Sequence, residues 1–124
     1  MNPEQLIKKA VEAQKRAKAP YSKYPVGAAL LLQDGKVIYG CNIESKAYPT
    51  TLCAERIAIF SAISQGYTKF QALALITQDG GTPCGGCRQI MHEYLGNIPI
   101  YIANNSIEKY KTLSIKELLP HPFG

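Results

Sequence analysis

The chain has 124 residues, of which 46% are hydrophobic and 19% charged, and its formal net charge is +5. This size suits one compact domain, expected over residues 1–124, and excludes two. The composition excludes a repeat, coiled-coil or low-complexity protein. No apolar run is long enough to cross a membrane, and the polar N-terminus lacks a secretory signal, so we expect a cytoplasmic protein without a membrane partner.

The positive charge does not by itself indicate a nucleic-acid partner. Basic residues are spread along the sequence, and only residues 8–18 hold a dense group of them. Such a group is typical of a solvated helix face, so we expect no nucleic-acid binding.

The first predicted element is a helix with one apolar stripe. Apolar residues recur at helical spacing over residues 6–17, while Pro3 suits the first helical turn and Pro20 ends the run.

A hairpin is predicted next. Residues 26–32 and 37–41 are β-capable runs on either side of Asp34-Gly35, a pair that favours a tight turn. Gly27 inside the first run indicates either a bulge or a close approach of another backbone segment.

The rest of the sequence alternates helical and β-capable segments. The predicted elements are a helix over 52–65, a strand over 72–77, a loop over 80–83, a helix over 85–95, a strand over 98–103 and a helix over 115–119. The first of these helices has little polar surface, so it should be buried against a sheet. Right-handed βαβ crossovers in this order predict an α/β fold with three α-β-α layers and a mixed central sheet.

Three cysteines have the pattern of a metal site. Cys84 and Cys87, in a Pro-Cys-Gly-Gly-Cys run, have the spacing of a metal knuckle, and Cys53 offers a third thiolate from another predicted helix. Both groups lie at predicted helix N-termini, where free N–H groups stabilise thiolates. Such spacing favours a metal or catalysis over disulfides, and we expect the fourth cysteine, Cys41, to be a buried free thiol.

Three protein ligands leave one position of a tetrahedral zinc ion open, as in catalytic sites. Three thiolates on Zn²⁺ carry a net charge of about −1, which Arg56 could offset by donating to a ligand sulfur. Glu55 follows Cys53 by two residues, so its carboxylate can reach a water on the metal and take its proton without being a ligand. We therefore expect one Zn²⁺ per subunit and a catalytic role for Glu55.

The two motifs together match the signature of zinc deaminases, in which His or Cys-x-Glu precedes Pro-Cys-x-x-Cys. Segments that resemble those of cytidine deaminases occur in order along nearly the whole chain, at residues 24–30, 41–44, 53–56, 83–89 and 117–120. Cysteine as the first ligand and the short length resemble the homotetrameric members of this family.

The resemblance also implies a substrate site. Asn42 and Glu44 would bind the ribose hydroxyls, and their spacing at a strand end puts both side chains on one face. Tyr24, at a position where the family usually has Phe, would line the base pocket, and Ala54 would also contact the substrate.

Two further aromatic residues have roles implied only by the resemblance. Tyr48 is similar to a tyrosine at a subunit interface near the ribose. Phe123 is similar to a C-terminal aromatic residue that reaches a neighbouring subunit's site, and an exposed tail residue is the alternative. Residues 45–51 depart from the family pattern, with Lys46 and Pro49 in the loop that should face the substrate.

The resemblance implies hydrolytic deamination of cytidine and deoxycytidine to uridine and deoxyuridine, as in pyrimidine salvage. One alternative keeps the chemistry but acts on a modified or N4-substituted pyrimidine nucleoside, or on an aminated nucleoside antibiotic. Two others are a polynucleotide-editing deaminase, which needs a basic groove with stacking aromatic residues, and a non-catalytic zinc module, which needs a fourth protein ligand.

Overall fold

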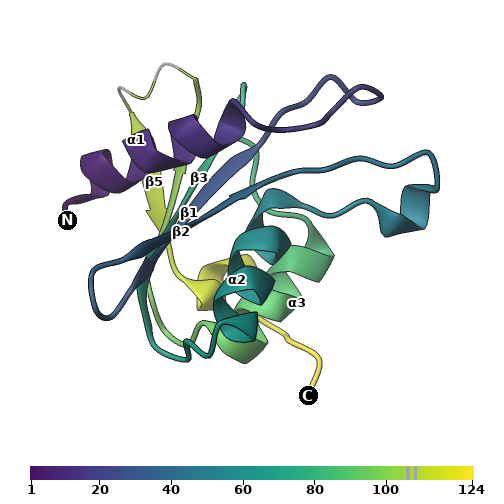
Figure 1. The fold of residues 1–124 in the computed structure, drawn as a ribbon. Coiled ribbons are helices and arrows are strands. Elements are labelled where there is room, and N and C mark those ends of the chain that lie inside the picture. The colour runs from purple at the N-terminus through teal and green to yellow at the C-terminus, as the bar shows by residue number, and fades with distance from the viewer. Residues whose placement is uncertain (106, 108) are drawn as a thin grey trace.

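The computed structural model describes residues 1–105, 107 and 109–124, which form a five-stranded sheet with helices on both faces (Figure 1). The helices are α1 (Pro3–Gln14), α2 (Ala54–Ser64), α3 (Gly85–Tyr94) and α4 (Ile115–Leu118), with a 3₁₀ turn, η1 (Tyr48–Thr50). The strands are β1 (Gly27–Leu32), β2 (Val37–Cys41), β3 (Phe70–Ile76), β4 (Ile100–Ala103) and β5 (Tyr110–Leu113). The predicted three-layer α/β architecture is confirmed. None of the helices in these residues has the length and apolar character needed to span a bilayer.

The sheet is mixed, with strand order β2-β1-β3-β4-β5. β1 runs antiparallel to both of its neighbours, and β4 runs antiparallel to β5. Among neighbouring strands in the described residues, the parallel pair is β3 and β4, because α3 connects them as a crossover.

The core lies on both faces of the sheet, and β1 shows how the residues are divided between them. Ala28 and Leu30 pack on the face covered by α2, α3 and α4, whereas Ala29 and Leu31 pack on the face covered by α1. Successive side chains of a strand point to opposite faces, so a central strand is apolar throughout. All six residues of β1 are buried.

Some predicted boundaries were wrong. The first helix ends at Gln14 and not near Ala17, because the backbone of Lys18 leaves it to pair with Asn42 and Glu44 beyond the end of β2. β5 was missed, since its four residues, two exposed and two half-buried, carry little hydrophobic periodicity.

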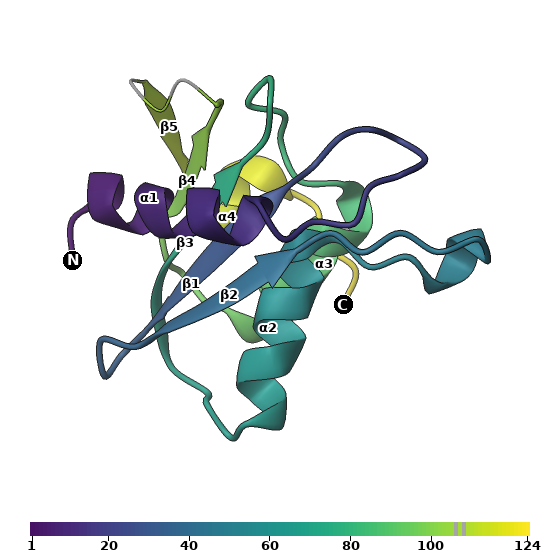
Figure 2. The same cartoon turned by 45° about the horizontal axis from the view of Figure 1, so that its top comes forward.

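One edge of the sheet gathers the segments that form the site. Gly27 at the start of β1 lies opposite Cys41 at the end of β2 and Ile76 at the end of β3. Residues 15–26 and 42–52 continue past this edge, and Figures 1 and 2 both show them projecting on the same side. The N-termini of α2 and α3 follow directly after segments that leave this edge.

At Gly27, α1 approaches the sheet closely, which is one of the two alternatives that the sequence left open, the other being a bulge. A Cβ atom there would overlap the carbonyl oxygen of Ala10 and lie 2.6 Å from the amide nitrogen of Gln14. A side chain would therefore push α1 away from β1.

We expect Gly27→Ala to lower the free energy of unfolding by about 3 kcal/mol, because the new methyl group meets rigid backbone. Urea unfolding at a fixed protein concentration measures this loss. Gly66→Ala is the matched control, because Gly66 has a φ of +93° and open space around it. The new methyl group meets no other atom there, so the left-handed backbone alone should lower the free energy of unfolding, by about 1 kcal/mol. Equal losses in the two variants would contradict the close packing at Gly27.

Candidate active site

Three cysteine sulfurs converge where α2 and α3 begin. Cys53 is the N-cap of α2, Cys84 is the N-cap of α3, and Cys87 lies in the first turn of α3. The Sγ atoms of Cys53 and Cys84 are 3.9 Å apart, and those of Cys84 and Cys87 are 3.2 Å apart. All three sulfurs lie within 4.8 Å of one another.

This cluster fits a tetrahedral zinc ion. Zinc–sulfur bonds of about 2.3 Å place neighbouring sulfurs about 3.8 Å apart, close to the separations seen here. In the described part of the chain, the group of potential ligands consists of these three cysteines and includes no fourth side chain. The donor set is therefore that of a zinc site with one position left for a small molecule.

The surroundings of the sulfurs stabilise negative charge. The amide of Cys87 points to Cys84 Sγ at 3.5 Å, and Nη2 of Arg56 donates to Cys53 Sγ at 3.3 Å, as predicted from the sequence. The hydrogen bond with Cys87 and the contact with Arg56 lower the pKa of Cys53 to about 5. The same pairing raises the pKa of Cys87, because the two thiols share one negative charge before a cation binds.

Glu55 lies in the first turn of α2 beside the three sulfurs. Its side chain is only 5% exposed and lines the pocket next to the cluster. Burial raises the pKa of its carboxyl group above the usual value, while a hydrogen bond with Cys87 opposes this shift. A buried carboxyl group whose pKa is shifted toward neutrality is suited to accepting and returning a proton.

A cavity of about 770 Å³ opens beside Glu55 and the cluster. It is large enough for a nucleoside. Its walls come from the two projecting segments, from the N-terminus of α2 and from the loop after β3. The residues that line it are Tyr21, Ser22, Tyr24, Val26, Asn42, Glu44, Ser45, Lys46, Tyr48, Thr51, Leu52, Cys53, Ala54, Glu55, Leu75, Thr77, Gly81, Thr82, Pro83 and Cys84.

Asn42 and Glu44 both line this cavity and also hold its wall together. Asn42 is buried; its Oδ1 accepts from the amide of Val26 and its Nδ2 donates to the carbonyl of Tyr24, each at 2.9 Å. Glu44 accepts hydrogen bonds from the backbone amide and the hydroxyl of Ser22. The hydroxyl bond lowers the pKa of Glu44, so this residue is a carboxylate at neutral pH.

The other proposed substrate residues divide into two groups. Tyr24, Ala54 and Tyr48 line the cavity. Phe123 does not: its side chain is 87% exposed, and its backbone is held by two hydrogen bonds with the amide group of Gln89. Within its own chain, Phe123 therefore lies outside the pocket.

The loop after β3 is a wall of the pocket that no motif in the sequence had indicated. Thr77, Gly81 and Thr82 line the cavity because this loop passes from the end of β3 to the first ligand of α3. The Gly-Gly-Thr-Pro run predicted a loop but gave no sign that it faces the substrate.

Comparisons with known proteins agree with this site. Residues 1–101 match the family described as "Cytidine and deoxycytidylate deaminase zinc-binding region". A cytidine deaminase of Sporosarcina psychrophila is 45% identical, covering 100% of this chain and 93% of that protein. The crystal structure of cytidine deaminase from Burkholderia pseudomallei superposes with a TM-score of 0.92 at 41% identity, covering 99% of this chain and 100% of that one.

A blasticidin-S deaminase of Bacillus cereus is also similar, with 31% identity covering 80% of this chain and 76% of that protein. The family match covers both metal-binding motifs, and the three converging sulfurs lie within it. The chain therefore belongs to the cytidine and deoxycytidylate deaminase family and carries the family's zinc site as three cysteines.

Proposed function

We propose that this zinc-dependent cytidine deaminase hydrolyses cytidine and deoxycytidine to uridine and deoxyuridine, in pyrimidine salvage. The observation that carries the proposal is a buried carboxylate, Glu55, beside three converging sulfurs in a nucleoside-sized cavity. Residues 1–124 act as one catalytic domain. The free thiols of the metal site suit a reducing cytoplasm.

Cys53, Cys84 and Cys87 would hold a zinc ion, which would lower the pKa of a water molecule to about 7 and so make it a nucleophile toward C4 of the cytosine ring. Glu55 takes the proton of that water and delivers it to N3 of the ring. It then takes the proton of the new C4 hydroxyl group and passes it to the exocyclic amine, so that the C4–N bond breaks, the C4 carbonyl forms and ammonia leaves. The burial of Glu55 supports this role, because a raised pKa brings proton uptake and release closer to balance.

The sugar binds at the wall formed by Asn42 and Glu44. Both side chains line the cavity, and Glu44 is charged. A carboxylate and an amide can accept from and donate to the ribose hydroxyls. Tyr24 and Ala54 contact the base, because both line the cavity into which Glu55 opens.

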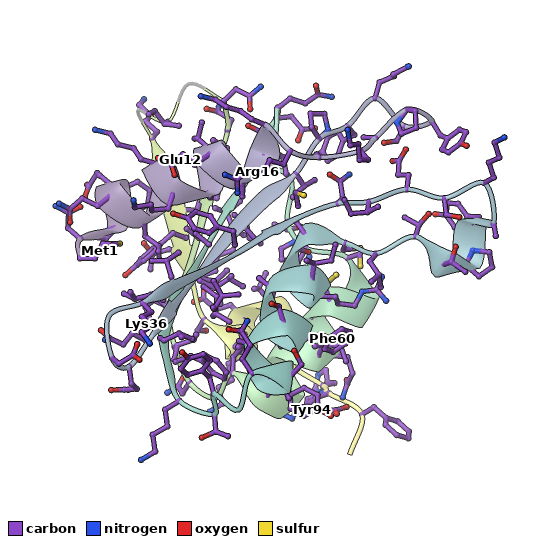
Figure 3. All side chains as sticks on the ribbon, in the orientation of Figure 1. Met1, Glu12, Arg16, Lys36, Phe60 and Tyr94 are labelled. Carbon is purple, nitrogen blue, oxygen red and sulfur yellow. The ribbon has the colours of Figure 1, made fainter. Side chains whose placement is uncertain are left out.

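The protein assembles as a homotetramer with one zinc ion per subunit. Large apolar side chains are exposed on the single chain, including Phe60 on α2 and Tyr94 on α3, which Figure 3 shows on the outer side of these helices. Tyr48 is 83% exposed at the rim of the cavity. Association of subunits would cover these side chains, place Tyr48 at an interface and bring Phe123 to a neighbouring pocket.

Glu55→Gln should lower kcat by several orders of magnitude, because the amide keeps the shape of the side chain but cannot take a proton. The rate at which absorbance falls as cytidine is consumed measures kcat. Elemental analysis should still find one zinc ion per chain. Glu12→Gln makes the same change at an exposed site on α1 and should keep full activity. Near-normal activity of Glu55→Gln would refute the acid/base role.

A second substrate class is supported by residues 45–51, which depart from the family pattern and contribute Lys46 and Tyr48 to the cavity. The similarity to a blasticidin-S deaminase also favours testing aminated nucleoside antibiotics. We expect the highest kcat/KM for cytidine and deoxycytidine in a screen that includes N4-methylcytidine, blasticidin S and a cytosine-containing oligonucleotide. A higher value for any of the last three would change the assigned substrate.

Light scattering on the protein as it elutes from a size-exclusion column measures the mass of the assembly and so tests the tetramer. We expect a mass of four times the 13.6 kDa of the chain. Phe60→Glu should reduce this mass, because a carboxylate cannot be buried unpaired at an interface. Tyr39→Glu on β2 serves as the control and should remain tetrameric. A fully active monomer would show that no residue of a second subunit is needed.

A further inference from the structure

The loop after β3 is tied to the segment before β1 by one carboxylate oxygen. Oδ1 of Asp79 accepts from the hydroxyl of Tyr24 at 2.5 Å, from the amide of Gly81 at 3.0 Å and from the hydroxyl of Thr77 at 3.2 Å. Thr77 is buried, and its hydroxyl also accepts from the amide of Gly81 at 2.9 Å. The hydroxyl of Tyr24 is therefore the donor in this cluster that comes from the opposite wall of the cavity.

Tyr24 is fixed at its backbone as well as at its hydroxyl group. Its carbonyl oxygen accepts from Nδ2 of Asn42 at 2.9 Å, and its amide donates to the hydroxyl of Ser22 at 3.1 Å. Ser22 in turn donates to Glu44. Tyr24 thus connects the wall that holds Asn42 and Glu44 to the loop that precedes the zinc ligand Cys84.

The two walls are also packed tightly where they meet. A Cβ atom on Gly81 would lie 2.7 Å from the hydroxyl oxygen of Tyr24 and 3.2 Å from Oδ1 of Asp79. Tyr24, Gly81 and Thr77 all line the cavity, so a shift of this loop would change its width.

The ionisation of the two partners is consistent with a strong hydrogen bond. Burial and the bond to Asp79 raise the pKa of Tyr24, and the bond from Tyr24 lowers the pKa of Asp79. At neutral pH a protonated phenol therefore donates to a charged carboxylate, which is the stronger type of hydrogen bond.

We propose that the hydroxyl of Tyr24 is a positioning group: its hydrogen bond to Asp79 holds residues 77–82 against the segment before β1 and so sets the width of the substrate cavity. This inference rests on the proposed function only for the identity of the substrate. Because the bond joins the walls and does not touch Glu55 or the zinc ligands, it should affect substrate binding more than the chemical step.

The test uses Tyr24→Phe, which keeps the ring, together with Asp79→Ala and the double variant. We expect Tyr24→Phe to raise KM for cytidine about tenfold, the equivalent of one hydrogen bond to a charged group, with kcat within about twofold of the parent protein. The double variant should be no worse than Asp79→Ala alone, because both changes remove the same bond. Tyr67→Phe is the control, since its hydroxyl bonds to Lys36 beside the hairpin turn and should leave KM unchanged.

Amide hydrogen exchange of residues 77–82, measured without substrate, separates this proposal from the proposed function. Faster exchange in Tyr24→Phe than in Tyr67→Phe is expected. Three outcomes would each overturn the positioning role. They are an unchanged KM, effects of Tyr24→Phe and Asp79→Ala that multiply in the double variant, and unchanged exchange in residues 77–82. Failure of the parent protein to deaminate cytidine would instead overturn the proposed substrate.

Discussion

The site depends on the meeting of two helix N-termini at one edge of the sheet. Cys53 caps α2 and Cys84 caps α3, and only this arrangement brings sulfurs that are thirty-one residues apart in sequence to 3.9 Å. A glycine in the sheet allows a helix to pack closely enough to reach this position. A Cβ atom on Gly40 of β2 would overlap the carbonyl oxygen of Ala54 and lie 2.8 Å from the amide of Ala58, so glycine allows α2 to pack directly on the hairpin.

Charge is the second constraint on this site. Three thiolates on a metal ion would lie beside the Glu55 carboxyl group, and both Cys87 and Glu55 are buried, so their negative charge would be unfavourable without compensation. Zinc supplies two positive charges, Arg56 donates to Cys53, and the helix N-termini contribute partial positive charge. Burial raises the pKa of Glu55, the hydrogen bond with Cys87 opposes this shift, and its carboxyl group is not part of the three-sulfur cluster.

The walls of the cavity are held by side chains that bond to backbone on neighbouring segments. Asn42 and Glu44 hold the segment before β1, and Asp79 holds the loop after β3. Irregular backbone satisfies its polar groups in this way when no strand is beside it. The residues that we assign to sugar binding therefore also keep the pocket in shape, and a change at either one affects both properties.

The sequence by itself determined the elements with strong periodicity and the residues that hold the metal. Helical spacing, the Asp34-Gly35 turn and the cysteine spacing depend on neighbours along the chain, so they could be predicted locally. The tertiary structure decided what depends on distant partners: the early end of α1, the strand β5, the exposure of Phe123 in its own chain and the bond from Tyr24 to Asp79. The end of α1, the position of Phe123 and the bond from Tyr24 to Asp79 depend on contacts between residues far apart in sequence, which leave no periodic signal in a single chain. β5 pairs with the preceding strand β4, but its exposed and half-buried side chains give too little hydrophobic periodicity to predict it.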